Sequence, residues 1–401
     1  MFPASPAKAV RVNATVTANL RIIQRESCMN HTLFAFSSHH SRGVPNGRQD
    51  ALSVFAGKTG FFFLRDRFGY LNAFSPYRVY EPCEEFPVST SVKTLADIMD
   101  GRAEELLARS GAEGRRLSLF VSGGVDSTAM TVAFLKAADG NFENLAVVYT
   151  KYSEQENPEF FELLKRMPGL TLKKVQPSRG LDDAQEEAMR DGYAVTGWCA
   201  DQLFGSQINQ DMPDMYFRDW RGFISTSEAV EQFEEAFAHY GMPIQNFGEF
   251  AWFTNFSCKY DFVKYTDVMI YGRVTGRMIP FYDTADFNSW SVSNFDRLHR
   301  YPQHEPEHYK RELKEYIYAF DGNRNYLEGK GKNPSWRMCD ASDGEYAQTY
   351  PVIAIAMESP SEVRVVRSGE YFIPSCNESV RRRDMSMKLA LLRSYLKNGG
   401  E

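Results

Sequence analysis

The hydrophobic pattern between residues 115 and 197 alternates between two periods. Short apolar runs predict buried strands, and stretches with apolar residues three or four positions apart predict helices. The run 115–140 combines a strand, a glycine turn and a helix; further strands are predicted over 144–150, 170–176 and 193–197, and helices over 157–167 and 181–191. Because strands that alternate with helices form parallel sheets, the pattern predicts an α/β fold with a doubly wound parallel sheet.

A different pattern precedes this region. Residues 31–90 contain short apolar runs, "TLFAF", "LSVFAG" and "GFFFLRDRFGYLNAF", which are separated by turn residues. Short apolar runs separated by turns predict short strands, which would form the last part of an antiparallel sheet. The next segment, 93–110, has apolar residues at helical spacing before a glycine-containing break, and therefore predicts a helix.

Residues 228–320 are predicted to be mostly helical, and many aromatic residues fall in one short part of them: Phe250, Trp252, Phe253, Phe256, Tyr260, Phe262, Tyr265 and Tyr271. A helical core explains this cluster better than a wall that stacks against a ligand. A strand pair is predicted over 345–375. The basic segment 381–397 predicts an amphipathic helix that packs leucines inward, although its charge also fits an anionic partner.

Composition limits the class of protein. The chain of 401 residues has a net charge of −6, which gives no general basic surface for nucleic acid. Its six cysteines are far apart, so we expect reduced thiols in a cytoplasmic protein rather than a zinc site or disulfide scaffold. No apolar run approaches the ~20 residues that span a membrane. Residues 1–48 are basic, as in an organellar targeting segment, but a start at Met29 explains them equally well.

The stretch "LFVSGGVDST" (119–128) carries the first candidate chemistry. A glycine-rich turn between a strand and a helix points backbone N–H groups at a ligand, and the helix N-terminus adds partial positive charge. Such a turn binds phosphate, and Ser122 and Ser127 add hydroxyl donors. Asp126 is an unfavourable neighbour for phosphate unless it holds a divalent metal that bridges to the phosphate oxygens. The stretch has neither the Gly-Lys-Ser/Thr of a Walker A loop nor a GxGxxG pattern.

The pattern Ser-Gly-Gly-x-Asp-Ser after a strand resembles the signature of the PP-loop ATP pyrophosphatases. Further stretches, in the same order, resemble segments of the asparagine synthetases of that family: "VTGWCADQLFGS" (195–206), "RMIPFYD" (277–283), "KRELK" (310–314) and "GKGKNPS" (329–335). The resemblance covers about residues 115 to 335 and implies a HUP-like fold. It divides the chain into an ill-defined segment (1–30), a truncated glutaminase-like β remnant (31–92), a ligase domain (93–335) with a helical extension, and a hairpin with a basic helix (336–401).

The resemblance also implies roles for individual residues. Pyrophosphate and ATP would be bound by Ser122, Gly123, Gly124, Asp126, Ser127 and Gly197, with adenosine near Tyr149 and Thr150 at the end of the second strand. Magnesium would be bound by Asp126 and Asp201.

Three lysines are candidate catalytic residues in the same comparison. Lys332 would stabilise the charge that develops when an amine attacks an acyl-adenylate, since a fixed ammonium aimed at developing negative charge lowers a barrier. Lys330 takes this role if the register differs, and Lys310 opens "KRELK". A solvated basic loop is the alternative explanation for Lys330 and Lys332.

These roles imply a two-step ligation that uses ATP and Mg²⁺. A carboxylate attacks the α-phosphate to give an acyl-adenylate and pyrophosphate, and ammonia or an amine then displaces AMP. The glutaminase nucleophile of the family is a cysteine directly after the initiator methionine, whereas Phe2 follows Met1 here and Cys28 lacks the family's following glycine. Glutamine is therefore not the expected nitrogen source.

The predicted substrate pocket departs from the family. Gly197, Trp198 and Cys199 stand where the family has Gly-Glu-Gly, and Gln202 stands where it usually has glutamate. Trp198 offers bulk and one N–H donor but no carboxylate. Aspartate is thus in doubt as the substrate, and a larger, more apolar or peptide-borne carboxylate fits better. The β-lactam synthetases and lasso-peptide cyclases, which are similar in scaffold, vary their substrates in this way.

Two other functions stay open. A non-catalytic nucleotide-binding descendant would explain Trp198, Gln202 and the missing glutaminase, but not the intact phosphate motif with Asp201 and Lys332. A PP-loop enzyme that modifies tRNA would need a catalytic cysteine pair and a basic face. We expect a small-molecule or peptide carboxylate and an amine or ammonia as partners, and neither membrane nor nucleic acid. The sequence leaves the oligomeric state open.

Overall fold

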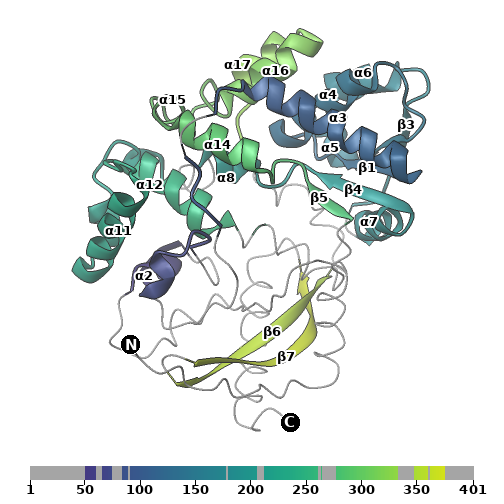
Figure 1. Ribbon diagram of the computed structural model, residues 1–401. Helices are drawn as coiled ribbons and strands as arrows, with labels where there is room; N and C mark the ends of the chain where they lie inside the picture. Colours follow the sequence, from purple (N-terminus) through teal and green to yellow (C-terminus); the bar gives the residue numbers. More distant parts are fainter. Residues whose placement is uncertain are drawn as a thin grey trace.

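In the computed structural model, the described residues are 50–59, 66–74, 84–88, 91–177, 179–205, 212–260, 263, 277–332, 347–359 and 362–374. They form an α/β core, a helical region rich in aromatic residues, and a two-stranded hairpin (Figure 1).

Five parallel strands form the central sheet in the order β3-β2-β1-β4-β5. Their bounds are Arg116–Phe120 (β1), Leu145–Tyr149 (β2), Thr171–Lys174 (β3), Gly192–Thr196 (β4) and Met278–Pro280 (β5). The strands predicted from the apolar runs, β1 to β4, are confirmed. Strand β5 escapes prediction because its three residues bury only one side chain, that of Ile279. The strand order reverses between β1 and β4, which is where open α/β sheets bind their ligands.

Helices cover both faces of the sheet, which confirms the α/β class and is compatible with the doubly wound arrangement. Leu119 and Val195 share a core with α3 (Leu95–Glu113) and α4 (Val125–Ala138), whereas Ala194 packs in the core of α7 (Arg179–Asp191). Neighbouring residues of a strand point to opposite faces, so each buried strand contributes to both cores. In Figure 1, α3 and α4 lie above the sheet and α7 lies below it.

Helix α3 illustrates how local sequence sets the helix ends. It begins after Thr94 because this residue and Asp97 form a capping box, and it ends at Gly114, whose φ of 61° is left-handed. Two more helices complete the α/β core, α5 (Lys151–Glu156) and α6 (Pro158–Lys165). Helix α5 escapes prediction because only Ser153 among its residues is buried.

The helical region contains α8 (Ala200–Phe204), α10 (Arg221–Ile224), α11 (Ser227–Tyr240), α12 (Phe247–Phe253), the π-helical turn η4 (Thr254–Cys258), α14 (Ala285–Ser293), α15 (Phe295–Leu298), α16 (Arg311–Asp321), α17 (Arg324–Gly329) and the 3₁₀ turns η2 (Leu71–Ala73) and η3 (Pro213–Met215). Its aromatic residues form a core, as predicted. The rings of Trp252 and Phe256 stack with their centroids 4.7 Å apart. Phe262, Tyr265 and Tyr271 lie outside the described residues.

The antiparallel strands predicted within 31–90 are wrong where the structure describes this segment. The residues of "LSVFAG" belong to helix α2 (Ala51–Thr59). Ala51, Leu52 and Phe55 lie on one helical face and are buried, and α2 packs against α11. A short continuous apolar run fits a buried strand and a buried helix equally well, so the pattern alone does not separate them.

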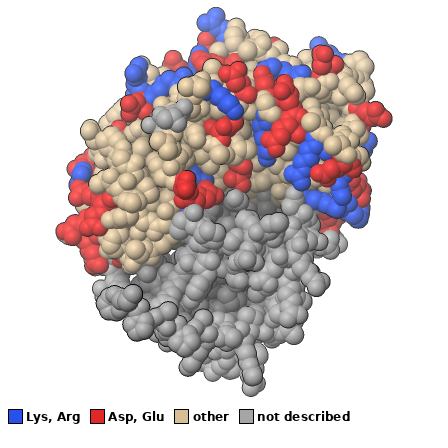
Figure 2. Space-filling view, viewed as in Figure 1, with Lys and Arg blue, Asp and Glu red and all other residues tan. Residues whose placement is uncertain are grey.

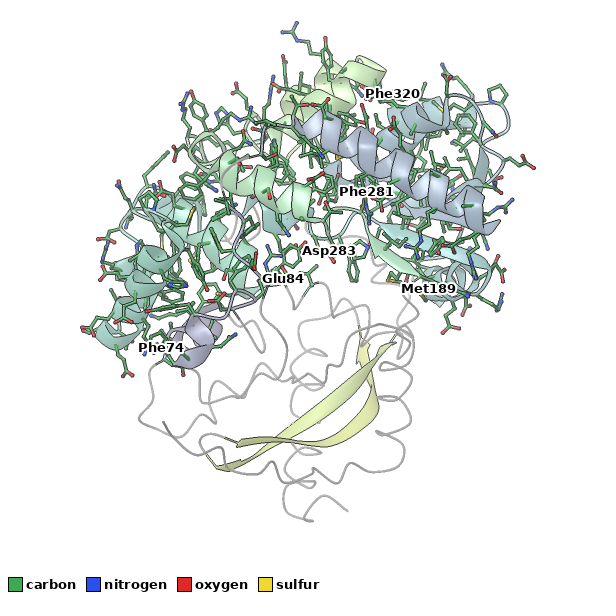
Figure 3. All side chains as sticks on the ribbon, in the orientation of Figure 1. Phe74, Glu84, Met189, Phe281, Asp283 and Phe320 are labelled. Atoms are coloured by element: carbon green, nitrogen blue, oxygen red, sulfur yellow. The ribbon has the colours of Figure 1, made fainter. Side chains whose placement is uncertain are left out.

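The run at 66–74 is a turn with η2 rather than a strand, because it is built around buried charges. Asp66 accepts hydrogen bonds from the hydroxyls of Tyr240 (2.9 Å) and Ser257 (2.7 Å). The guanidinium of Arg67 lies 3.2 Å from Glu84, which Figure 3 labels. Tyr240 and Ser257 come from distant parts of the sequence, and they join the segment to the helical region in one continuous core.

Strands β6 (Ala347–Ser359) and β7 (Glu362–Pro374) pair antiparallel, which confirms the strand pair predicted over 345–375. The basic helix predicted over 381–397 lies outside the described residues. None of the helices in the described ranges combines the length and the apolar composition needed to cross a membrane. On the face drawn in Figure 2, Lys and Arg are interspersed with Asp and Glu.

Acid is expected to destabilise the protein through His299. This imidazole is buried beside Trp252 and Phe295, neither of its nitrogens has a hydrogen-bond partner, and burial lowers its pKa to about 3. The unfolded chain, with an ordinary pKa near 6.5, therefore binds more protons below that pH, and stability falls by about 1.4 kcal/mol per pH unit. Urea unfolding of the protein and of His299→Phe at pH 6.5 and 4.5 checks this. The variant should lose about 2–3 kcal/mol less between the two values.

The matched control is His239→Phe, because His239 is an exposed histidine that stacks on Tyr70 with centroids 4.7 Å apart. This control should keep the acid sensitivity of the parent protein. Equal acid sensitivity in all three proteins would rule out His299 as its source.

Candidate functional site

The loop 121–124 connects β1 to α4 at the carboxyl edge of the sheet. The N–H of Ser122 donates to Oγ of Ser127 (3.1 Å), and the N–H of Gly124 donates to Oγ of Ser122 (3.3 Å). The two hydroxyl oxygens lie 3.0 Å apart. The predicted phosphate-binding residues therefore form one compact turn at the N-terminus of α4, a helix of 14 residues.

Two glycines allow the close approaches on which this turn depends. Gly123 has a φ of +83°, and a Cβ there would lie 2.5 Å from the carbonyl oxygen of Ser153 in α5. Gly197 follows β4, and a Cβ there would lie 2.9 Å from the backbone nitrogen of Ser127. Because neither position has room for a side chain, the turn after β1 packs closely against α5, and the loop after β4 packs closely against the start of α4.

Two carboxylates and two ammonium groups converge beside the turn. The Nζ of Lys310 lies 2.6 Å from Oδ2 of Asp126 and 2.7 Å from Oδ1 of Asp201. The Nζ of Lys332 lies 2.6 Å from Oδ2 of Asp201. These residues belong to α4, α8, the residue before α16 and the segment after α17. The structure thus brings together four candidate residues that the sequence holds far apart.

The charges in this cluster are strongly coupled. Burial disfavours the charged form of Asp201, but the attraction of Lys310 and then of Lys332 outweighs it and holds the pKa of Asp201 well below its usual range. Burial and the nearby Asp201 raise the pKa of Asp126 despite Lys310. For Lys310, burial is outweighed by the two carboxylates, which raise its pKa. The Lys310–Asp201 pair therefore stays ionised at neutral pH.

Lys310 is held in an unusual backbone conformation. Its φ of 46° and ψ of 45° are left-handed, which L-residues other than glycine rarely adopt. Its N–H donates to Oε1 of Gln303 (3.1 Å), and its side chain has no exposed surface. A strained residue persists where its surroundings over-determine it, and such residues cluster at functional sites.

Two buried tyrosines position the phosphate turn, and sequence reasoning misses their role. The hydroxyl of Tyr282 donates to the backbone oxygen of Asp126 (2.9 Å), and that of Tyr326 to the backbone oxygen of Gly123 (3.4 Å). Burial raises the pKa of both phenols, so they remain donors. Tyr282 stands in "RMIPFYD", so its segment carries a signal, whereas nothing marks Tyr326. Figure 3 labels Phe281 and Asp283, which flank Tyr282 in the sequence.

The candidate Lys330 pairs with a different carboxylate from those of the cluster. It forms an ion pair with Glu156, at the end of α5, and does not share the carboxylates of Lys310 and Lys332. Lys314, the last residue of "KRELK", is fully buried. Its ammonium donates to the backbone oxygen of Pro306 and lies 3.4 Å from that of Lys330. Lys314 is thus a positioning residue for the segment that carries Lys330 and Lys332.

The residues predicted to meet adenosine use their side chains within the fold. Tyr149 is buried, and its ring packs against Phe161 with centroids 4.7 Å apart. Thr150 caps α5 by accepting the N–H of Ser153. Tyr149 ends β2 and Thr150 follows it, at the same edge of the sheet as the phosphate turn.

Of the two residues predicted to line a substrate pocket, Trp198 stands between β4 and α8, and Gln202 belongs to α8. Trp198 is half-buried and packs against the main core, and Gln202 is buried. Cys199, also buried, has a left-handed backbone with a φ of 74°. This conformation explains why a glycine is the ordinary residue at such a position.

Substitutions at Cys199 should therefore rank in an unusual order of stability, with glycine tolerated better than valine. Cys199→Gly relieves a left-handed residue and is expected to stay within about 1 kcal/mol of the parent, whereas β-branched Cys199→Val should cost about 2 kcal/mol or more. Cys258, a buried cysteine in η4, provides the control, because glycine should be the worse substitute there. Thermal melting of the four variants checks the order. The same order at both positions would contradict backbone strain at Cys199.

The two carboxylates fit a hard divalent cation that arrives with phosphate. Mg²⁺ is commonly bound by one or two carboxylates, and water and substrate phosphates complete its shell. In the described ranges, no group of three or more His, Cys, Asp or Glu could hold an ion alone. Asp126 and Asp201 lie close enough to share one ammonium, beside a turn suited to phosphate. The donor set therefore fits a metal ion that is bound together with phosphate.

No protein-family model matches the chain, and no curated protein matches it either. The chemistry of the site is therefore inferred from the residues that form it.

Proposed function

We propose that the protein is an ATP-dependent, AMP-forming ligase that joins a carboxylate to ammonia or an amine. The observation that carries the proposal is the convergence of Asp126 and Asp201 on Lys310, beside a glycine turn at the switch point of a parallel sheet. Ligands of open α/β sheets bind at this place. Carboxylates, ammonium groups and a helix N-terminus together suit a magnesium nucleotide.

Each part of the site has a task in this reaction. The turn with Ser122 and Ser127 would bind the departing pyrophosphate at the N-terminus of α4. Asp126 and Asp201 would hold Mg²⁺, which when bound neutralises negative charge on the phosphates. Lys310 would turn from the carboxylates to the phosphate oxygens. Tyr282 would keep the turn in place through the backbone oxygen of Asp126.

The bonds change in two steps. An oxygen of the substrate carboxylate attacks the α-phosphorus of ATP, the bond between the α-phosphorus and the bridging oxygen breaks, and pyrophosphate leaves. Ammonia or an amine then attacks the acyl carbon, and the bond between this carbon and the phosphate oxygen breaks. AMP leaves with the electron pair, and the nitrogen releases one proton to solvent as the amide forms. Lys332 extends from the edge of the cluster, where its ammonium would stabilise the negative charge of the second step.

The acid is expected to differ from aspartate. Half-buried Trp198 stands just before α8, where it provides an apolar surface and no carboxylate to pair with an amino group. Gln202 is buried in α8 and likewise brings no charge. A larger or more apolar carboxylate, free or at a peptide end, therefore suits the site.

Hydroxylamine trapping tests the function whatever the natural amine is. Acyl-adenylates react with hydroxylamine to give stable hydroxamates, whose masses identify the acid. The purified protein is incubated with ATP, Mg²⁺, hydroxylamine and either a panel of acids or the small-molecule fraction of a cell extract. We expect hydroxamate, AMP and pyrophosphate in equal amounts.

Two results would overturn the proposal. Formation of ADP and phosphate would place the cleavage at the wrong bond. Tight ATP binding without AMP in any mixture would identify a non-catalytic nucleotide-binding protein instead.

A further inference from the structure

Among the described residues, the lysine and carboxylate cluster is balanced in charge without a ligand. Asp126 and Asp201 are matched by Lys310 and Lys332, and the four groups form a continuous chain of ion pairs. The side chain of Lys310 has no exposed surface, while each carboxylate is 25% exposed. Lys310 thus occupies the space between the carboxylates, and water reaches only their outer sides.

We propose that Lys310 is a built-in counter-ion that takes the place of the metal between Asp126 and Asp201, so that a divalent metal binds only together with a pyrophosphate-type anion. The inference rests on the proposed function, because it concerns the order in which the same site is loaded. It adds a restriction that the ligase chemistry alone does not require.

Charge balance provides the physical reason. A divalent metal entering alone would change the net charge of this largely buried cluster from zero to about +2, and Lys310 would stand beside the metal without a partner. A pyrophosphate anion that enters with the metal can form an ion pair with the ammonium of Lys310. The carboxylates are then free for the metal, and each charge has a partner.

The backbone of Lys310 is held in place, so only its side chain has to move when its ammonium changes partner. Its N–H is held by Gln303, and its left-handed φ of 46° is set by the start of α16. The long stem and compact ammonium of a lysine can turn from one anion to another without backbone motion. Lys332 pairs with the other oxygen of Asp201, Oδ2, so Lys310 and Lys332 do not share a carboxylate oxygen.

Manganese binding measured by electron paramagnetic resonance tests the proposal. Mn²⁺ is titrated into the full chain without nucleotide, with and without pyrophosphate. The parent protein should bind Mn²⁺ weakly alone and much more tightly with pyrophosphate. Lys310→Met should bind Mn²⁺ alone at least about tenfold more tightly than the parent, because the competing charge is gone. Lys136→Met, which removes a surface lysine of α4 paired with Asp100, should behave like the parent.

A second measurement uses the parent protein alone and therefore tests the proposal even if the Lys310→Met variant folds poorly. Thermal melting of the parent protein is followed with Mg²⁺, with pyrophosphate, and with both. Neither alone should raise the melting temperature appreciably, and the pair should raise it clearly. Tight metal binding by the parent without pyrophosphate, or additive effects of the two ligands, would overturn the proposal. Since no ATP, acid or amine is present, a failure here is distinct from a failure of the hydroxylamine test.

Discussion

A Lys310→Met variant is expected to lose about 3 kcal/mol of unfolding free energy in the absence of metal and nucleotide. The side chain is fully buried, and its ammonium holds Asp126 and Asp201 together. Methionine fills the space but leaves two like charges facing each other. Removing one partner of a buried ion pair costs about 3–5 kcal/mol, and the lower end applies because water reaches part of both carboxylates.

Urea unfolding followed by circular dichroism measures this loss. Lys136→Met is the matched control, because Lys136 pairs with Asp100 at 2.6 Å on the surface, and its loss should cost at most about 1 kcal/mol. Adding Asp126→Asn to Lys310→Met should recover part of the stability, since it removes the repulsion between the carboxylates. A Lys310→Met variant as stable as Lys136→Met would contradict a buried counter-ion.

The sheet could be predicted from sequence because its strands are short, buried and separated by helices of recognisable period. Strand β2 is apolar and buried on both faces, which is typical of a parallel sheet covered on both sides. The segment 51–74 could not be predicted in the same way. Helix α2 is specified by its packing against α11, and the following turn is tied to the helical region by Asp66, which accepts hydrogen bonds from Tyr240 and Ser257, 174 and 191 residues away. Local patterns carry no record of such contacts.

The candidate site likewise has one part that local sequence predicts and one part that depends on distant contacts. The phosphate turn is local, so Ser122, Gly123 and Ser127 are legible in one short stretch of sequence. Asp201, Lys310 and Lys332 stand out only because their order along the chain resembles a known family. That resemblance carries no geometry. The buried position of Lys310 between two carboxylates, and the donation of Tyr326 to the turn, follow only from the fold.

Geometry also separates the three candidate lysines. Lys310 is shared by two carboxylates and buried, Lys332 touches one carboxylate at the edge, and Lys330 is paired with Glu156. A group that must reach a reacting acyl-adenylate needs access as well as charge. Lys332 therefore suits the second step, and Lys310 suits the control of charge at the metal position.

Asp126→Asn and Asp201→Asn are each expected to lower AMP formation by about 10³-fold. Each substitution keeps the shape of the side chain but removes one of two anionic ligands that would hold Mg²⁺. Metal charge stabilisation contributes several kcal/mol to a transition state, and each 1.4 kcal/mol is a factor of ten. Lys310 keeps its remaining carboxylate in either variant, so the fold should persist. Hydroxamate and AMP formation under saturating ATP measure the loss.

Asp286→Asn is the control for these variants, because Asp286 pairs with Lys93 on the surface and its side chain is 53% exposed. It should leave AMP formation unchanged. Circular dichroism of all three variants separates lost chemistry from lost structure. If Asp126→Asn or Asp201→Asn fold normally and retain AMP formation within about tenfold of the parent, the two carboxylates do not hold the metal, since a ligand of that kind contributes more than one factor of ten. The convergence on Lys310 would then be a structural ion-pair network, and the phosphate turn would have to act without it.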